Sequence, residues 1–398
     1  MKKPILLLCV LLLFFSVSVW AKDFGLILDQ SPAYAGSGDE GEFEYTGLAL
    51  PRFSALFGDN ADFYISAAFR ADYQAETWAF LPELLRTEIS WHSDGTEIKA
   101  GRMLYSDPLG FIANGLFDGA RFSFDTASGT FSAGGWYTGF LYKKRANITM
   151  TAEEQIAYDS EIDYNDFADT YFASSRVIAA LDWEHLLLNE TLRLKLSLLG
   201  QFDLSDSDIH SQYAVAKITF PVGNFIFDLG GSLGLVEASG FDSKADIGLA
   251  GEVGIGWMLP TAIDDRLSFI GRFSSGLIDG GSITPFMPVT TATQGDVFKG
   301  KLSALSVLSL DYKARLQESL SMALTSSYFI RSDLQSYQQY GSDGYMLGNE
   351  FFGRLLWSPV SDLQLNLGGG IFLPAMGDAA PDADSLWRVE LNIILSLY

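Results

Sequence analysis

The stretch that decides the fold is TLRLKLSLLGQFD, residues 191–203. Leucine stands at every second position from Leu192 to Leu198, and arginine, lysine and serine stand between the leucines. Successive side chains of a β-strand point to opposite faces, so this segment has one apolar face and one polar face. We expect the leucines to face lipid, and Arg193 and Lys195 to face the inside of a barrel.

The same alternation returns along the whole chain. It predicts eighteen strands, at residues 23–29, 41–57, 61–72, 84–93, 96–105, 117–126, 130–143, 174–184, 191–203, 212–220, 224–238, 244–258, 266–276, 299–314, 319–331, 348–357, 362–373 and 385–398. Glycine, proline and aspartate supply the backbone angles of brief connections such as 94–95 and 221–223. The other connections are long, and the largest are 144–173, 277–298 and 332–347. Short periplasmic turns that alternate with long external loops are typical of a membrane-spanning barrel.

A soluble β-sandwich also alternates, but three features favour the membrane barrel. The predicted strands number about eighteen, whereas an ordinary sheet has roughly 4–6. Many of them exceed the ~10 residues that cross a bilayer at a tilt of about 45°. Aromatic residues lie near strand ends, as in an interfacial girdle; they are Trp78, Phe80, Trp91, Trp136, Tyr137, Trp183, Trp257, Trp357 and Trp387.

We therefore predict an all-β protein: one transmembrane antiparallel β-barrel of about 18 strands over residues 22–398. Both of its ends should lie on the periplasmic side. Sixteen strands is the alternative if the short segment 23–29 stays outside the wall.

Residues 1–21 have the pattern of a signal peptide. Lys2 and Lys3 form a basic start, residues 5–19 are mostly apolar, and Ala21 ends a usable cleavage site. The alternative, a transmembrane anchor, needs roughly 20 apolar residues, more than this run provides. Cys9 is the only cysteine, so we expect a mature chain without disulfides.

The charge of the chain is strongly acidic. Without Lys2 and Lys3, 24 basic residues face 49 acidic ones, for a net charge of −25. Such a chain is a poor partner for nucleic acid. The surplus acid lies mostly in the predicted loops, and one cluster is in the 144–173 loop, where Asp159, Glu161 and Asp163 have the spacing of a calcium loop. Tyr164 and Thr170 replace its glycine and closing glutamate, so solvation of an exposed loop is the simpler interpretation. We expect no metal and no cofactor.

The predicted inward faces carry charges of both signs. The candidate pore-lining residues are Arg70, Arg86, Glu88, Arg102, Arg121, Arg176, Arg193, Lys195, Arg272, Arg331, Glu350, Arg354 and Arg388. A barrel of eighteen strands is too wide for side chains to fill, and unpaired charges in a dry interior would be prohibitive. The charges either pair around a wet wall or protrude and select solutes by charge.

Catalytic motifs are weak. Gly36-Ser37-Gly38-Asp39-Glu40-Gly41 matches a dinucleotide fingerprint but opens no helix, and Gly230-Gly231-Ser232-Leu233-Gly234 matches a nucleophile elbow but lies in the middle of a strand. The three histidines have no spacing that supports nucleophilic catalysis. We predict that the protein is not an enzyme.

Two stretches resemble the alginate-export family of outer-membrane porins. One has Gly101-Arg102 followed by Phe117-Asp118-Gly119-Ala120-Arg121; the other has Gly348-Asn349-Glu350, Pro359, and Gly368-Gly369-Gly370-Ile371-Phe372-Leu373-Pro374. The resemblance implies an eighteen-strand barrel that passes a solute across the outer membrane without energy of its own. It also implies that Arg102, Arg121 and Glu350 belong to the wall or the lumen.

We therefore expect a porin in the outer membrane of a diderm bacterium. It would allow passive diffusion of small hydrophilic solutes, including sugars or anionic compounds. A fatty-acid-type hydrophobic transporter and a surface-binding structural barrel are the alternatives. The expected partners are membrane lipid, the solutes, and the barrel-assembly machinery through the last strand, which ends in Tyr398.

The 144–173 loop is long enough to fold back into the pore. Lys143, Lys144, Arg145 and Arg176 at its base would face its acidic residues across the gap. The alternative is an external flap. The sequence leaves the solute and the oligomeric state open.

Overall fold

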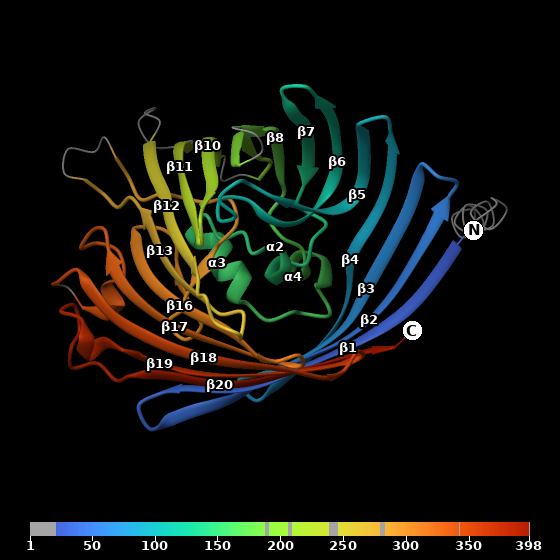
Figure 1. Ribbon diagram of the computed structural model, residues 1–398. Coiled ribbons are helices and arrows are strands. Elements are labelled where there is room, and N and C mark those ends of the chain that lie inside the picture. The colour runs from blue at the N-terminus through green and yellow to red at the C-terminus, as the bar shows by residue number, and fades with distance from the viewer. Residues whose placement is uncertain are drawn as a thin grey trace.

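The computed structural model describes residues 21–187, 191–205, 209–238, 246–278, 283–341 and 343–397. They form one closed antiparallel barrel of 18 strands, in which neighbours follow chain order and the first strand pairs with the last (Figure 1). Apart from Ala21, the expected signal peptide lies outside the described residues, and so does Tyr398.

The wall strands are β1 (Ala21–Ser37), β2 (Glu40–Phe57), β3 (Ala61–Gln74), β4 (Thr77–Ser93), β5 (Thr96–Ser106), β6 (Asn114–Thr126), β7 (Gly129–Tyr137), β8 (Arg176–Leu187), β9 (Leu192–Asp203), β10 (Ile209–Val222), β11 (Phe225–Ala238), β12 (Asp246–Met258), β13 (Arg266–Ser274), β16 (Leu305–Gln317), β17 (Leu320–Arg331), β18 (Met346–Val360), β19 (Leu363–Leu373) and β20 (Leu386–Leu397). A separate small sheet holds β14 (Thr293–Gln294) and β15 (Gly300–Lys301). The helices are α2 (Lys143–Ala146), α3 (Ala152–Asp159), α4 (Phe167–Tyr171), η1 (Gln338–Tyr340) and η2 (Pro374–Met376).

The prediction of eighteen antiparallel strands is confirmed, and the sixteen-strand alternative is wrong. The predicted strand 23–29 is a full wall strand of 17 residues, because it continues past Pro32. Ser31 and Pro32 have no partner in the register between β1 and β20. Proline has no N–H to donate, so at this position it costs the sheet no hydrogen bond with β20. The rejected fingerprint at 36–41 is the turn between β1 and β2.

The expected strict alternation of short and long connections is wrong for the first two hairpins. Strands β1 and β2 are joined at 38–39, and β3 and β4 at 75–76. In both hairpins, residues expected in a loop extend the strands instead. The predicted strand 130–143 ends at Tyr137, because Leu141 and Tyr142 turn away and become buried. The predicted strand 299–314 begins only at Leu305.

The faces of β9 agree with the alternation of its sequence. Leu196 and Leu198 are exposed on the outer surface, whereas Lys195 contacts Glu184 inside the barrel at 3.1 Å. Ser197 also points inward, where its hydroxyl donates to Asp182 at 2.7 Å. In the described part of the chain, no helix is long and apolar enough to cross a membrane.

We expect Leu198→Arg to destabilise the barrel in lipid by roughly 2–4 kcal/mol at the bilayer midplane and by less near an interface. The physical reason is the transfer of a guanidinium from water into hydrocarbon. The free energy of unfolding by urea in lipid vesicles measures the effect. The matched control is Arg193→Ser on the inward face of the same strand, which should change stability little. Equal losses in both variants would reverse the assignment of faces.

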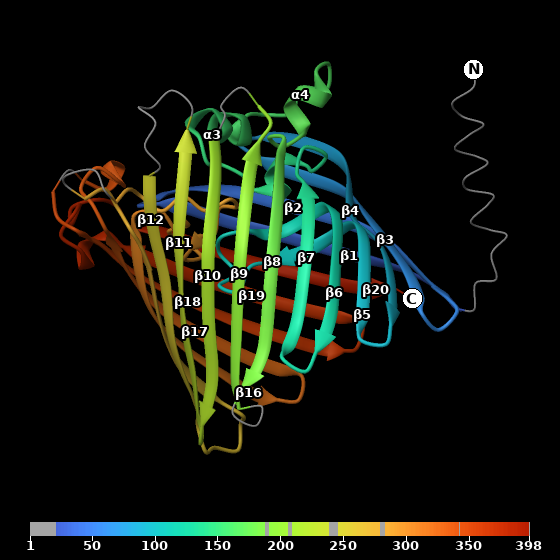
Figure 2. The same cartoon turned by 90° about the horizontal axis from the view of Figure 1, so that it is seen from above.

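Three chain segments fill part of the barrel interior (Figure 1). They are 107–113 between β5 and β6, 138–175 between β7 and β8, and 283–304 between β13 and β16. Figure 2 shows α3 and α4 at one end of the barrel and the β10–β11 turn at the other. The end with the helices carries the long connections.

Candidate functional site

The inner wall carries a belt of charged side chains. The strand register places these cations on its inward face: Arg70, Arg86, Lys99, Arg121, Arg193, Lys195, Lys217, Arg272, Lys313, Arg354 and Arg388. Many of them pair with a nearby carboxylate, for example Arg86 with Glu88 at 2.8 Å. So many charges need water around them, because a dry interior would not solvate them.

A polar cavity of about 400 Å³ lies between the wall and the 107–113 segment, and we call it the first cavity. Its charged lining residues on the wall are Arg121, Asp182, Glu184, Lys195 and Lys217. Arg121 contacts Asp182 at 3.7 Å. Lys195 and Lys217 are direct neighbours across two strands. Like charges at that spacing repel, so the pair favours an anion between or beside the two ammonium groups.

Arg121 adds an unused donor to the first cavity. Its Nε is buried and has no hydrogen-bond partner within the described ranges. A guanidinium presents a planar fork of N–H groups that matches a carboxylate or a phosphate. The first cavity is lined by three cations and three carboxylates. The Asp107 carboxylate belongs to the covering segment, where it accepts four backbone N–H groups, so the wall itself presents three cations against two carboxylates, which is the chemistry of an anion site.

A second cavity of about 350 Å³ lies between the wall and residues 293–296. Its charged lining residues are Arg272, Asp296, Asp311, Lys313, Glu350 and Arg354. Arg354 donates to Asp296 at 2.6 Å. Glu252 links the two cavities, because it contacts Lys217 of the first at 3.1 Å and Arg272 of the second at 2.7 Å. Charged groups thus continue along the wall from one cavity to the other.

Asp107 shapes the segment that covers the first cavity. Its carboxylate accepts four backbone N–H groups at 2.8–3.0 Å, from Leu109, Gly110, Ile112 and Ala113. Burial raises the pKa of Asp107, and the four bonds oppose that shift. Leu109 touches the backbone of β11 so closely that a Cβ on Gly230 would collide with it. The segment therefore reaches through the interior from β5 and β6 to β11.

The three inserted segments are bonded to one another. The N–H of Thr290 donates to the carbonyl of Ile112 at 3.0 Å, and the N–H of Thr291 donates to the carbonyl of Asn147 at 2.8 Å. Lys301 donates to the hydroxyl of Thr149 at 3.0 Å, and burial lowers the pKa of Lys301. The segments share one buried apolar cluster with the wall, so they narrow the interior together.

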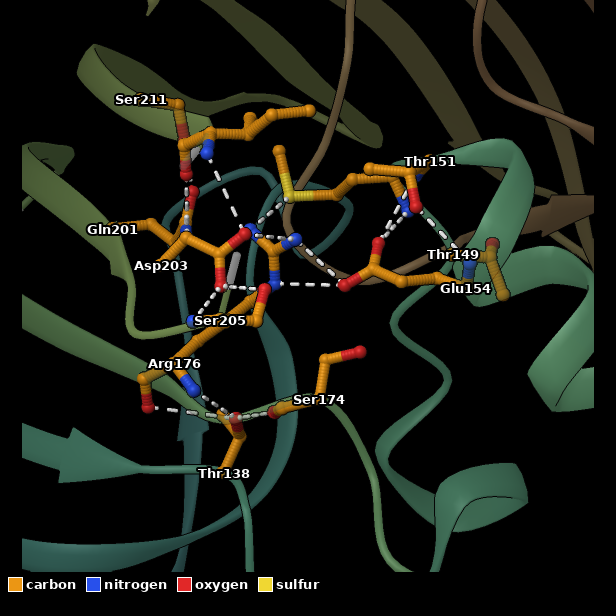
Figure 3. Close-up of polar contacts among 12 residues, drawn as sticks. Thr138, Thr149, Thr151, Glu154, Ser174, Arg176, Gln201, Asp203, Ser205 and Ser211 are labelled. Atoms are coloured by element: carbon orange, nitrogen blue, oxygen red, sulfur yellow. Dashed lines mark hydrogen bonds and ion pairs between the residues drawn. The ribbon is translucent and has the colours of Figure 1, made fainter. Parts of the chain in front are cut away.

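Arg176 fixes helix α3 to the wall (Figure 3). Its side chain is fully buried, and its Nη2 lies 2.6 Å from Glu154 of α3 and 3.3 Å from Asp203 of β9. Glu154 also accepts the N–H groups of Met150 and Thr151, at 2.8 and 3.0 Å. The Thr151 hydroxyl accepts the Glu154 N–H in return, which makes a capping box. The same carboxylate therefore starts the helix and holds it against the wall.

The register places nine of the thirteen predicted pore-lining residues on the inward face along the belt. These are Arg70, Arg86, Glu88, Arg121, Arg193, Lys195, Arg272, Arg354 and Arg388. That they line a conducting path stays a prediction.

Arg176, Arg331 and Glu350 also point inward, but they are buried under inserted segments. Glu350 accepts three backbone N–H groups of residues 296–298, and Arg331 donates to four backbone carbonyls of residues 336–344. All three residues anchor loops. Glu350 also lines the second cavity, whereas Arg176 and Arg331 line neither cavity.

Arg102 corrects the prediction, because it does not lie on the inward face. It shares a strand face with Ile98 and Leu104, which are exposed on the outer surface. Its guanidinium binds Asp118 at 2.7 and 2.9 Å and donates to the carbonyl of Phe140 at 2.9 Å. The sequence interpretation followed the residue type and the family motif; counting the alternation from Ile98 would have placed it outside.

Sequence reasoning missed Lys217 and Asp107. The alternation around Lys217 is weak, because the inward residues Tyr213 and Val215 pack against inserted segments and are apolar. The sequence offers one signal for Asp107, the Asp107-Pro108 pair in a short loop, which indicates a turn. The pair does not show whether the loop folds into the barrel or away from it. Groups of three or more His, Cys, Asp or Glu that could hold a metal ion are absent from the described residues.

No family model and no curated protein matches the sequence. Solved structures match the fold over nearly the whole chain. Pseudomonas aeruginosa OccK2 (OpdF) aligns with a TM-score of 0.65 at 13% identity, over 96% of this chain and 99% of that chain. Its complex with glucuronate aligns with a TM-score of 0.63 at 12% identity, over 96% and 97%.

Two further proteins of Pseudomonas aeruginosa give similar values. OpdK with vanillate aligns with a TM-score of 0.62 at 12% identity, over 94% of this chain and 98% of that chain. The outer membrane protein OprD aligns with a TM-score of 0.57 at 13% identity, over 96% of both chains. The chain has the eighteen-stranded barrel fold of these outer-membrane proteins, and the resemblance to alginate-export porins gains no support from them.

Proposed function

We propose that the protein is a porin of a bacterial outer membrane that lets small hydrophilic solutes diffuse passively, with a preference for anions. The observation that carries the proposal is the first cavity. There, Arg121, Lys195 and Lys217 surround about 400 Å³ of polar space beneath the inserted segments. A narrow wet passage with more cations than carboxylates on its wall concentrates anions by focusing the electric field.

The comparisons support the proposal at the level of fold. The solved structures of OccK2 with glucuronate and of OpdK with vanillate contain a carboxylate ligand each. A small carboxylate fits the donors of the first cavity. The guanidinium of Arg121 presents two parallel N–H groups to it, and the ammonium groups of the two lysines add positive charge. The motif resemblance to alginate-export porins agrees with passive export or uptake but rests on those motifs alone.

The proposal is tested by single-channel recording in planar bilayers. The intact protein should pass current in steps, and its reversal potential in a salt gradient should indicate preference for chloride over potassium. A glucuronate gradient should also carry current. A reconstituted barrel that passes no current would contradict the proposal and favour a structural or surface-binding barrel.

We expect Lys217→Gln to lower the chloride-to-potassium permeability ratio by roughly two- to fivefold. One unit charge at about 4 Å in water changes the free energy of an ion by about 1 kcal/mol. Reversal potentials at low salt measure the effect, because screening is weakest there. The matched control is Arg315→Gln, a cation at the periplasmic turn whose guanidinium bonds the backbone of Glu318. If both variants shift the ratio equally, the first cavity does not set the selectivity.

A further inference from the structure

The barrel wall has an unpaired stretch between β4 and β5. Their register runs from Ser93 opposite Thr96 to Thr87 opposite Arg102 and stops there. Strand β4 continues to Thr77 paired with β3 alone, and β5 continues to Ser106 paired with β6 alone. In the pairings of the described chain, the two strands therefore separate over the part of the wall nearer the long loops, and we call this part the seam.

Three local features open the seam. Leu85 has no partner on β3, since Arg86 pairs with Ser66 and Leu84 with Ala67, and such a bulge bends a strand. Pro82 cannot donate to a ladder, which makes it tolerable on an unpaired edge. Gly101 has a φ of +118° and lies so close to β4 that a Cβ would collide with the Thr87 carbonyl oxygen. The last rung thus depends on a glycine.

Side chains cap the β4 edge in the seam in place of a neighbouring strand. The Tyr171 hydroxyl donates to the carbonyl of Pro82 at 2.8 Å. The Tyr164 hydroxyl accepts the N–H of Phe80 at 3.0 Å and also reaches its carbonyl. Arg102 donates to the carbonyl of Leu84. Few side-chain bonds, most of them from one loop, hold an edge that a full ladder would otherwise hold, so the closure is weak for a barrel wall.

The seam lies in the outer half of the membrane span. On β4, Trp78 joins an aromatic cluster with Tyr45 and Tyr73, and Trp91 lies at the other end of the strand, near the short turn. Thirteen residues separate the two tryptophans, which at ~3.3 Å per residue and a tilt of about 45° is close to the bilayer thickness. Leu84 lies midway, so the unpaired edge runs from the middle to the interface near the long loops.

The seam combines guanidinium groups with apolar rings. Arg102 binds Asp118 on the outer side, and Arg145 binds Glu83 on the inner side at 2.7 Å. Tyr171 stacks on Tyr142 and Phe167 next to them, at 4.9 and 4.6 Å between ring centres. Outside, Phe140 and Leu104 are exposed to the lipid side.

We propose that the seam opens laterally and passes an amphipathic carboxylate between the barrel interior and the outer half of the membrane. The carboxylate of the solute first replaces Glu83 as the partner of Arg145. It then replaces Asp118 as the partner of Arg102. The alkyl or aryl part passes between the tyrosine rings and leaves past Phe140 and Leu104. This proposal rests on the proposed placement in an outer membrane, and it adds a second exit to the hydrophilic path.

A crosslink across the seam tests the proposal. The variant E83C/R145C replaces the ion pair that joins β4 to the loop, and residues 22–398 contain no other cysteine. A short bismaleimide should lower the uptake of labelled decanoate at least tenfold in cells that lack other outer-membrane channels. Single-channel current and glucuronate uptake should stay unchanged. The control pair S93C/T96C lies on facing positions of the paired part of β4 and β5 and outside the charged belt, and its crosslink should alter neither readout.

Loosening the seam should have the opposite effect. Y164F/Y171F keeps the rings and removes the hydroxyls that cap β4. Decanoate uptake should rise by about tenfold, the population change expected from three lost hydrogen bonds at the lower end of their usual strength. The control is Y328F, which removes a similar bond, donated by a tyrosine of β17 to the carbonyl of Met376.

The outcomes separate the two proposals. If the protein passes current and glucuronate, but decanoate uptake ignores the crosslink and the tyrosine variants, the lateral exit is wrong and the porin stands. If decanoate uptake follows the current in every variant, decanoate uses the lumen only, which also overturns the lateral exit. If the intact protein passes neither current nor glucuronate, the porin function itself fails.

Discussion

Deletion of residues 150–168 raises the single-channel conductance several-fold and weakens ion selectivity: this is the result we expect from planar bilayer recordings at low salt. The deleted stretch contains α3 and the start of α4. These helices lie within the ring of strands in Figure 1, and Figure 2 places them at the end of the barrel that carries the long connections. Its removal frees Arg176 to face water and takes away the contact of Lys301 with Gln155. A wider, less charged passage conducts more and discriminates less.

A matched deletion guards against a general effect of loop length. Residues 380–383 lie in the exposed connection between β19 and β20, so shortening this connection should leave the current unchanged. An unchanged current after deletion of 150–168 would mean that solutes follow a path that the helices do not narrow. The sequence-based prediction that this loop constricts the pore would then be wrong.

We expect Arg176→Met to remove about 3–5 kcal/mol from the free energy that holds α3 inside the barrel. The side chain is fully buried, and its loss removes the guanidinium that pairs with the carboxylates of Glu154 and Asp203. Removing one partner of a buried ion pair leaves an uncompensated charge, which is strongly destabilising. The measurements are protease susceptibility of residues 150–168 in lipid vesicles and the frequency of current steps between open levels.

Arg193→Met is the matched control for Arg176→Met. Arg193 also pairs with a carboxylate, Glu184 at 3.3 Å, but more than half of its side chain is exposed to the wet interior. Pairs of that kind contribute about 0–1 kcal/mol. Equal sensitivity of the two variants to protease would show that burial of Arg176 does not hold the helix.

The wall could be predicted from the sequence because the side chains of a strand in a membrane barrel alternate between lipid and the water-filled interior. In β9, Leu196 and Leu198 meet lipid, and Lys195 and Ser197 meet water or a polar neighbour, so register and face follow from the alternation. Leu199 is the exception, because it points inward and packs in the interior cluster. The same rule places most of the charged belt. It was not applied to Arg102, whose outward position depends on Asp118 and on two backbone carbonyls.

The ends of two strands differ from the prediction, and in both the missing part contains a proline. Pro32 and Pro82 both lie inside strands, at positions where the neighbouring strand makes no rung. The sequence shows that proline lacks an N–H. It does not show that the adjacent strand makes no rung at that position, because this depends on residues far along the chain. For that reason the predicted strands began at 84 and ended at 29 instead of reaching the turns at 75–76 and 38–39.

The candidate site was least predictable because segments far apart in the chain build it. The first cavity needs Lys217 of β10 and the 107–113 segment at the same place. Glu350 resembles any other inward carboxylate in a strand pattern. Its burial comes from residues 296–298, which donate three N–H groups to it from another loop. Alternation gives the direction of a side chain but not what covers it.

The pairing of β1 with β20 also sets the order in which the chain can fold. Asn392 bonds Asp29 across a separation of 363 positions, and closing a chain loop of that length costs about 5 kcal/mol of entropy. Contacts between such distant residues form slowly. Until they form, β1 and β20 are the two open edges of one sheet, each able to pair with a foreign strand. Asn392 then donates hydrogen bonds to Asp29 and Ser31 on the inner face of the wall, and these bonds select the correct register of β1 and β20 when the barrel closes.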